Sequence, residues 1–225
     1  LGDVYKRQIG AGAFYDCSFS GNLVIPDSVT SIGRYAFYSL PYLRPETQGT
    51  LTLGRNLRTI GESAFCESRY TGSLTIPDSA VEIGERAFYK CENLNGTLTL
   101  GRSLRTIGKE AFYWCAFTGS LTIPEGVAEI ADGAFSSLYQ FNRDGMFNGT
   151  LTLPSTLKTI GAEAFAYTDF SGELLIPDGV TSIGANAFKE CDGFGGTLSL
   201  PDSVKTVGES AFYLCKGFTG PVSYT

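Results

Sequence analysis

Apolar and polar residues alternate in short runs that recur along the whole chain. In Leu74-Thr75-Ile76, for example, leucine and isoleucine point to one face of an extended segment and threonine points to the other. Such a run is typical of a short strand with one buried face. Proline or glycine follows each run, and because proline has no N–H to donate to a sheet, we expect the strand to end there.

More apolar positions follow each of these strands. A second pair, such as Val81 and Ile83, is expected to face the same interior, and the next glycine, Gly84 in this copy, predicts a tight turn with an unusual backbone angle. An Ala-Phe pair comes next, and we expect it to form a single helical turn that places a large ring in the middle. This pair recurs with phenylalanine at Phe14, Phe37, Phe65, Phe88, Phe112, Phe135, Phe165, Phe188 and Phe212.

The spacing of these phenylalanines identifies the architecture. Successive intervals are 23, 28, 23, 24, 23, 30, 23 and 24 residues, which is the period of a repeat protein. One unit cannot bury its own apolar face, so neighbouring units must stack, with parallel strands about 4.8 Å apart. We therefore predict a repeat solenoid with a parallel β-sheet of about eight short strands, and with turns and short helical segments on its other side.

One further residue of each unit completes the predicted core. It lies two positions before the glycine that precedes a strand, and it is aromatic in all but one of these copies. The residues are Phe19, Tyr70, Leu94, Phe117, Phe147, Phe170, Phe194 and Phe218.

The repeated unit resembles a known family. Residues 174–191 read Leu-x-Ile-Pro-x-x-Val-x-x-Ile-Gly-x-x-Ala-Phe-x-x-Cys, which is similar to the BspA-like, Treponema-pallidum-type leucine-rich repeat. The resemblance extends from about Ile9 to Gly220, although a Gly-Ser or Gly-Thr pair before the strand departs from the usual unit. It implies a bacterial protein that is extracellular or on the cell surface, because BspA-like proteins are generally described as adhesins and surface binders.

The two ends of the chain differ from the repeats. Asp3 to Gln8 is the translation of GAT GTG TAT AAG AGA CAG, and Pro221 to Thr225 can be encoded by a string that contains its reverse complement. The string resembles a transposase adapter used in shotgun sequencing. We therefore expect residues 1–8 and 221–225 to be adapter-derived tails of a metagenomic fragment, and residues 9–220 to form about nine repeats truncated at both ends.

Composition narrows the chemistry. The 225 residues, of 24.1 kDa, are 43% hydrophobic, which is enough for a continuous core, and a net charge of -6 offers no basic field for nucleic acid. Histidine is absent, which removes the commonest general base and the usual zinc ligand. No run of eighteen apolar residues occurs, so the sequence predicts no membrane-spanning helix. We expect no catalytic residue, metal site or cofactor.

The cysteines have a simpler explanation than chemistry. Five of the six follow the repeat phenylalanine by three residues, where other copies have leucine, so we interpret them as small apolar core residues. Disulfides between stacked neighbours, Cys91 with Cys115 and Cys191 with Cys215, are the alternative. The five residues are Cys17, Cys91, Cys115, Cys191 and Cys215.

A carboxylate follows the strand-ending proline in several copies. Two carboxylates at a suitable distance could act in glycoside hydrolysis, but these recur once per unit at a turn, so we expect each of them to cap the backbone of its own turn. They are Asp27, Asp78, Glu125, Asp178 and Asp202.

Hydroxyl side chains line the outer face of the predicted sheet. The simpler explanation is that threonine is the polar residue best suited to a strand. The functional alternative is a surface that binds glycan, a protein partner or ordered water, with Thr75, Thr99 and Thr122 as candidate contacts; curvature would disturb the regular lattice that ordered water needs. The sixteen outward residues, twelve of them Ser or Thr, are Asn22, Val24, Thr50, Thr52, Ser73, Thr75, Thr97, Thr99, Ser120, Thr122, Thr150, Thr152, Glu173, Leu175, Thr197 and Ser199.

Two longer connections, residues 38–46 and 137–147, supply the other candidate contacts. Insertions in repeat arrays gather on one rim, and exposed aromatic residues with arginine are typical of recognition hot spots. The alternative is that each insertion folds its aromatic residues back over the coil. The candidates are Tyr42, Arg44, Tyr139, Phe141 and Arg143.

These features lead to three hypotheses for function. The first is a non-catalytic binding module of a secreted or surface bacterial leucine-rich repeat protein that recognises protein or glycan. The second is a structural spacer that displays another domain of a larger protein, and the third is an enzyme, for which no nucleophile and base stand at a workable spacing. Open strand edges also predict end-to-end self-association, unless the tails cover those edges.

Overall fold

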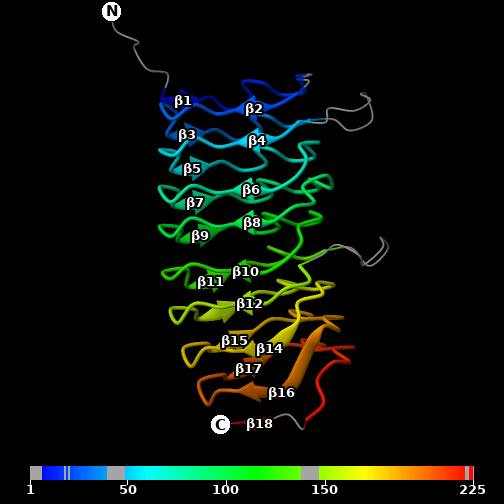
Figure 1. The fold of residues 1–225 in the computed structure, drawn as a ribbon. Helices are drawn as coiled ribbons and strands as arrows, with labels where there is room; N and C mark the ends of the chain where they lie inside the picture. The colour runs from blue at the N-terminus through cyan, green and yellow to red at the C-terminus, as the bar shows by residue number, and fades with distance from the viewer. Residues whose placement is uncertain are drawn as a thin grey trace, which may run out of the picture.

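The chain winds into a solenoid whose coils stack along one axis (Figure 1). The computed structural model describes residues 7–17, 19, 21–39, 49–137, 147–220 and 223–224. We number the coils one to nine by their repeat phenylalanines, from Phe14 in coil one to Phe212 in coil nine. Contacts between strands connect neighbouring coils, which confirms the predicted repeat solenoid.

Two parallel ladders run along the stack. The first contains the predicted Leu-Thr segments, and the second contains the apolar pair that ends in isoleucine. The strands of the first ladder are β2 (Leu23–Val24), β4 (Leu51–Thr52), β6 (Leu74–Thr75), β8 (Leu98–Thr99), β10 (Leu121–Thr122), β12 (Leu151–Thr152), β14 (Gly172–Leu175), β16 (Phe194–Leu200) and β18 (Ser223–Tyr224). The strands of the second ladder are β1 (Gln8–Ile9), β3 (Ser31–Ile32), β5 (Thr59–Ile60), β7 (Glu82–Ile83), β9 (Thr106–Ile107), β11 (Glu129–Ile130), β13 (Thr159–Ile160), β15 (Ser182–Ile183) and β17 (Thr206–Val207).

Apart from a register shift between β14 and β16, pairing in both ladders joins equivalent residues of neighbouring coils. Leu74 lies opposite Leu98 and Thr75 opposite Thr99, so leucine stacks on leucine inside and threonine on threonine outside. The predicted ladder of about eight strands is therefore confirmed, and the second ladder is an addition. Equivalent residues form columns, so any surface feature of the unit can be duplicated along the solenoid.

The first ladder is interrupted after every second coil. Among the described residues its strands pair as β2-β4, β6-β8, β10-β12 and β14-β16-β18, whereas the second ladder runs from β1 to β9 and from β11 to β17. The glycine before the strand follows the same alternation as far as β14. Gly72 and Gly119 have φ of 84° and 78°, whereas a Cβ at Gly96 would lie 2.6 Å from the backbone nitrogen of Ser73. Gly196, the equivalent glycine in β16, breaks the alternation with φ of 74°. Along the first ladder, the coils are therefore paired two by two as far as β12.

The third side of each coil carries the Ala-Phe pair. The short helical segments predicted there are not found in the part of the chain that the structure describes. Residues on both sides of the pair instead have left-handed backbones, as Ser63 (φ 51°) and Glu67 (φ 59°) do around Phe65. Turn hydrogen bonds alternate with bonds to the next coil, such as the one that Phe65 N donates to Ala87 O at 2.8 Å. The neighbouring coil therefore accepts hydrogen bonds that a helix would make internally.

The glycine after each isoleucine is required by close packing. Gly33, Gly84 and Gly184 do not have a positive φ, so the predicted unusual backbone angle is wrong at these positions. A Cβ at Gly84 would lie 2.7 Å from the backbone nitrogen of Glu62 in the preceding coil. Two backbones meet here, and no side chain can fit between them.

A stack of phenylalanine rings fills the centre of the solenoid, as predicted. Ring centroids of successive repeat phenylalanines are between 5.1 and 5.6 Å apart, and the planes of Phe88 and Phe112 differ by only 2°. The second aromatic column packs edge-on against the first, with Phe117 lying 6.0 Å from Phe112 at 72°. This interior is one continuous core from coil two to coil eight.

The described parts of both expected tails join the ladders. Gln8 pairs with Ser31 in the second ladder, and Ser223 pairs with Ser199 in the first. Strand β18 therefore covers part of the open edge of β16. The edge of β17 remains uncovered by any described strand.

Apolar side chains are exposed at both ends of the stack. Coil one leaves a hollow of about 650 Å³, lined in part by Phe14 and Phe19. In coil nine, Val207, Tyr213 and Leu214 are exposed. Each end therefore has the composition of an interior surface that a further coil could cover.

Candidate functional site

The outer face of the first ladder presents the predicted hydroxyl surface. All sixteen outward residues are exposed. Thr75, Thr99 and Thr122 lie on three successive coils of this face, with Thr75 directly opposite Thr99. The structure thus brings these three candidate contact residues onto one surface.

The two outward columns differ in their hydrogen bonds. In the first column, Ser73 Oγ accepts from Thr97 N at 3.0 Å and Ser120 Oγ accepts from Thr150 N at 2.9 Å, so these hydroxyls tie paired coils together. Within the described residues, the threonines of the second column make no side-chain hydrogen bond. We call this column the hydroxyl row, and it consists of Thr52, Thr75, Thr99, Thr122 and Thr152.

A groove of about 720 Å³ lies across the hydroxyl row at strands β4, β6 and β8. Thr52, Thr75 and Thr99 line it, together with Arg55 and Asp78 at the strand ends. The groove includes the place where β4 and β6 do not pair, so the interruption of the ladder contributes to its shape. A trough lined by hydroxyl and charged groups can form hydrogen bonds with an extended polar ligand.

Three of the five carboxylates after the strand-ending proline, Asp27, Asp78 and Glu125, bind the next coil. Asp78 Oδ1 accepts from Arg102 N at 3.1 Å, Asp78 Oδ2 accepts from Arg102 Nε at 2.8 Å, and Glu125 Oε1 accepts from Ser155 N at 3.1 Å. The expected capping of their own turns is replaced by capping of the stacked turn, whose amide lies within reach. Hydrogen bonds from Arg102 lower the pKa of Asp78, and those from Ser155 lower the pKa of Glu125. These carboxylates connect coils.

All six cysteines are free thiols, and most of the interior ones make a hydrogen bond that the sequence did not predict. Cys91 Sγ donates to Phe65 O of the preceding coil at 3.1 Å. Burial raises the pKa of Cys66 to about 12, so this thiol stays protonated at neutral pH. The same bond to the preceding repeat phenylalanine is made by Cys115, Cys191 and Cys215.

The remaining candidate contacts lie outside the described residues. They are Tyr42, Arg44, Tyr139, Phe141 and Arg143. Ser39 and Ser137, the described residues at the start of these connections, each stand two residues after a repeat phenylalanine. These two serines therefore lie on the same rim of the solenoid.

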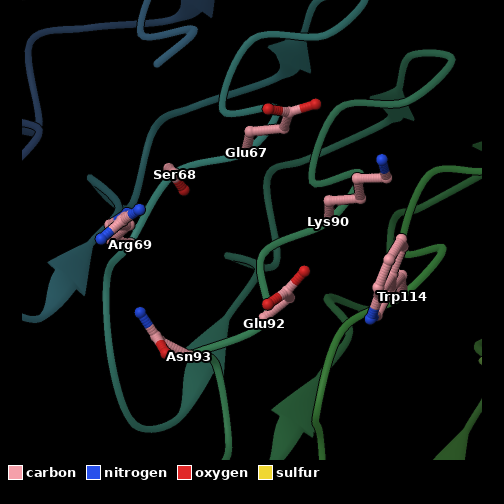
Figure 2. Close-up of a pocket in the computed structure, with 7 residues that line it drawn as sticks. All are labelled: Glu67, Ser68, Arg69, Lys90, Glu92, Asn93 and Trp114. Carbon is pink, nitrogen blue, oxygen red and sulfur yellow. The ribbon is translucent and has the colours of Figure 1, made fainter. Parts of the chain in front are cut away.

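Sequence reasoning missed a pocket of about 380 Å³ on this rim. Figure 2 shows it between the turns of coils three and four, with Trp114 of coil five at one side. Glu67, Lys90 and Trp114 all stand two residues after a repeat phenylalanine and have left-handed backbones, with φ of 59°, 57° and 60°. We call this pocket the Trp114 corner, and it is lined by Glu67, Ser68, Arg69, Lys90, Glu92, Asn93 and Trp114.

Two features of the sequence could have indicated the Trp114 corner. Leu94 follows its repeat phenylalanine by six residues, whereas Tyr70 follows by five, so coil four has one residue more in this turn. Glu92 and Asn93 of this longer turn are exposed. Trp114 is the single tryptophan of the chain, and it lies in the next coil. Only the stacking of the coils brings these residues to one place.

Cation–π contacts hold the aromatic side of the Trp114 corner. Lys90 Nζ lies 4.8 Å from the ring centroid of Trp114 and 5.4 Å from that of Tyr89. Arg86 lies 5.5 Å from the centroid of the same tyrosine, and its Nε pairs with Glu110 Oε2 at 2.6 Å. Each such exposed contact contributes about 0.5–1 kcal/mol, and the contact from Lys90 restrains the indole of Trp114.

Within the ranges that the structure describes, no three Cys, Asp or Glu side chains are grouped so that they could hold a metal ion. In the same ranges, no helix has the length and apolar composition that crossing a membrane requires.

Comparison with solved structures gives the same architecture. A leucine-rich repeat protein from Bacteroides ovatus ATCC 8483 superposes with a TM-score of 0.68 at 28% identity, over 97% of this chain and 52% of that one. A leucine-rich repeat protein from Eubacterium ventriosum ATCC 27560 superposes with a TM-score of 0.52 at 21% identity, over 96% of this chain and 57% of that one. The chain thus spans only a little more than half the length of these two proteins.

Comparison of sequences defines the family. No curated protein sequence matches the chain. The family described as the BspA type leucine-rich repeat region matches residues 7–142 and 139–220, in 6 copies. These ranges contain the columns of leucine, isoleucine and phenylalanine that form the core, and the chain belongs to the BspA-type leucine-rich repeat family.

Proposed function

We propose that the chain is a non-catalytic binding module of a secreted or surface-exposed bacterial protein, and that it recognises protein or glycan. The hydroxyl row carries this proposal, because it places in one line five exposed threonine hydroxyls that have no hydrogen-bond partner among the described residues. The groove over β4, β6 and β8 gives part of this line a concave shape. The general role of BspA-like proteins as adhesins supports the surface location and the binding role.

The hydroxyl row suits recognition by many weak contacts. Threonine on a strand has a restricted χ1 angle, so its hydroxyl loses little rotamer freedom when it binds. Each hydroxyl can both donate and accept a hydrogen bond, which matches sugar hydroxyls and peptide groups equally well. Beside the groove, Arg55 Nε pairs with Asp27 Oδ2 at 2.9 Å, so the charged side chains there are paired with each other.

Glycan and protein microarrays probed with the whole chain test this proposal. We expect binding to a limited set of spots and at least a tenfold loss of signal in the double variant Thr75→Arg and Thr99→Arg, which fills the groove from exposed positions. Thr106→Arg, at an exposed threonine of β9 outside both the groove and the hydroxyl row, is the matched control, and it should bind as the unmodified chain does. Silence on both arrays, or unchanged binding by the double variant, would contradict the proposal.

The structural spacer is the second candidate function. It is favoured by the regular stacking of equivalent residues, which gives the chain a defined length along one axis. A spacer predicts no array signal. It also predicts that removal of one pair of coils from the longer parent shortens the display distance and leaves the parent's binding unchanged, which a binding module does not.

We also propose end-to-end self-association, in which coil nine of one molecule covers coil one of another. Exposed Phe14 and Phe19 at one end and Tyr213 and Leu214 at the other provide apolar surfaces for this contact. Sedimentation velocity over a range of concentrations should show mass increasing with concentration. Phe14→Glu combined with Leu214→Glu should restore the monomer, and a monomer at high concentration without these changes would contradict the contact.

A further inference from the structure

The Trp114 corner lies on the third side of the coil, after the Ala-Phe pair, and the hydroxyl row lies on the outer face of the first ladder. We propose that the Trp114 corner is a binding site for a neutral sugar residue of a glycan. This inference rests on the proposed function of a binding module, and adds to it a ligand class and a second site. The charge, the hydrogen-bonding groups and the single indole of the pocket support this ligand class.

The charges of the Trp114 corner are balanced. Glu67 and Glu92 supply two carboxylates, and Arg69 and Lys90 supply two cations. A pocket without net charge gives no overall electrostatic attraction to an anion or to a cation. The balance therefore favours a neutral ligand that can satisfy donors and acceptors at the same time.

Hydroxyl groups are the ligand groups that meet this requirement. Carboxylates accept hydrogen bonds, the Arg69 guanidinium donates them, and the Asn93 amide does both. Each sugar hydroxyl can likewise donate to one group and accept from another. Ser68 contributes little to this recognition, because it is 4% exposed and its Oγ already lies 3.2 Å from Cys91 Sγ.

The indole of Trp114 supplies the apolar wall that a sugar ring also needs. The C–H groups on one side of a pyranose ring form an apolar patch, and tryptophan offers a large rigid surface for such a patch. Lys90 restrains this ring from the neighbouring coil. A volume of about 380 Å³ lies at the small end of the range for ligand pockets, which suits a mono- or disaccharide unit.

The solenoid contains an internal control for this site. Coils seven and eight repeat the turn lengths of coils three and four, with Glu190 in the place of Lys90, and Leu214 of coil nine stands in the place of Trp114. Asp169 replaces Arg69, so the equivalent corner has neither the balanced charge nor the indole. We expect it not to bind sugar.

The single tryptophan makes a direct experiment possible. The whole chain is titrated with lactose, maltose, cellobiose and N,N′-diacetylchitobiose while the fluorescence of Trp114 is recorded. At least one of these probes should shift or quench the emission in a saturable way. Glu92→Gln and Asn93→Ala should each weaken the affinity roughly three- to tenfold or more, as expected for the loss of hydrogen bonds to a bound ligand. Asp192→Asn, at the position equivalent to Glu92, is the matched control and should leave the titration unchanged.

A second measurement tests the role of Trp114 directly. Because Trp114→Ala removes the fluorophore, its binding is measured by saturation-transfer NMR with the same disaccharides. The saturation-transfer signals of the disaccharides should be lost in this variant. Circular dichroism should show that its fold is unchanged. Absence of any saturable change with the four probes overturns the inference. Sialyllactose is negatively charged and glucosamine is positively charged at neutral pH. If either binds more tightly than the neutral probes do, the inference that the ligand is a neutral sugar is wrong.

The proposed function is tested separately by the groove variant. If Thr75→Arg with Thr99→Arg abolishes array binding while no probe affects Trp114, the hydroxyl row binds and the Trp114 corner does not. If the groove variant instead abolishes the fluorescence response, the sugar site is the groove and the inference about the Trp114 corner is wrong.

Discussion

Coils one to five and coils five to nine are two versions of one four-coil unit. The intervals between their phenylalanines are 23, 28, 23 and 24 residues in the first half and 23, 30, 23 and 24 in the second. The interiors agree closely, since Phe88 lies 5.3 Å from Phe112 and Phe188 lies 5.3 Å from Phe212. The surfaces differ, because Trp114 in the first half is replaced by Leu214 in the second. In this protein, the surface can therefore change without any change in the core.

The same contrast holds for the left-handed residues beside the Ala-Phe pair. Lys90 and Glu190 occupy equivalent positions and both have φ of 57°, although their charges are opposite. The stacked backbone dictates the conformation, and the side chain remains free to vary. Differences of this kind between the halves make each half a control for the other.

The largest expected effect would come from the phenylalanine stack. Phe88→Ala and Phe188→Ala should each lower the free energy of unfolding by about 3–5 kcal/mol, because both rings are fully buried and leave a cavity. Urea denaturation followed by circular dichroism measures these losses. Phe14→Ala, at a ring that is 37% exposed, should cost less. A large difference between the Phe88 and Phe188 variants would break the equivalence of the two halves.

Removal of the buried thiols should have the next largest effect. Cys91→Ala and Cys191→Ala each delete one donor to the carbonyl of Phe65 or Phe165, at a cost of about 0.5–1.5 kcal/mol, because that carbonyl keeps a second donor in Ser68 or Thr168. Cys17 is exposed, so Cys17→Ala should be close to neutral in the same denaturation assay. Equal stability of all three variants would show that the thiol hydrogen bonds contribute nothing.

Relief of left-handed strain should be smaller and of opposite sign. Ser63 and Glu163 are equivalent residues with φ of 51° and 55°, and replacement of either by glycine should stabilise the fold by about 0.5–1 kcal/mol. Gly133 has φ of 61° and already occupies this position in coil six, so Gly133→Ala should be destabilising. The three variants together test whether backbone conformation at this position is common to both halves.

Acidification should have a smaller effect still. The pKa of Asp78 and that of Glu125 are lowered in the folded state, so their contribution is complete above the unfolded pKa of about 4 and is lost as pH falls through the folded value. Melting temperatures measured between pH 7 and pH 3 should therefore decline. The melting temperature of Asp78→Asn should decline less steeply with falling pH than that of the unmodified chain. If the two slopes are identical, the decline comes from other groups.

A charge replacement at an exposed turn should have the smallest effect. Asp78 lies opposite Arg102 in the first half, whereas the equivalent positions of the second half hold Asp178 and Asp202. Asp202→Arg should recreate the ion pair and raise the melting temperature slightly, because exposed pairs contribute little. Because salt screens exposed charges, this increase in melting temperature should vanish at high salt. An increase that persists in 1 M salt would come from packing and not from the ion pair.

Much of the fold could be predicted because it is local and repeated. The alternation around Thr75 predicted an outward hydroxyl, and the recurrence of Phe88 predicted a central stack; the exposed threonines and the ring contacts confirm both. The second ladder was missed as a ladder, since each strand in it has only two residues. The helical turn was expected because the sequence does not reveal that a neighbouring coil will accept the hydrogen bond from Phe65 N.

The sequence alone determined the repeat, the face on which each apolar column lies and the absence of histidine chemistry, because these depend on residue type and period within one unit. The tertiary structure decided which units touch and how closely. The Trp114 corner joins three coils, the Cys91 thiol reaches Phe65 in the preceding coil, and Asp78 binds the turn of Arg102 in the next. Each of these contacts connects residues more than twenty positions apart, and the periodic pattern specifies that units stack without specifying which polar groups meet.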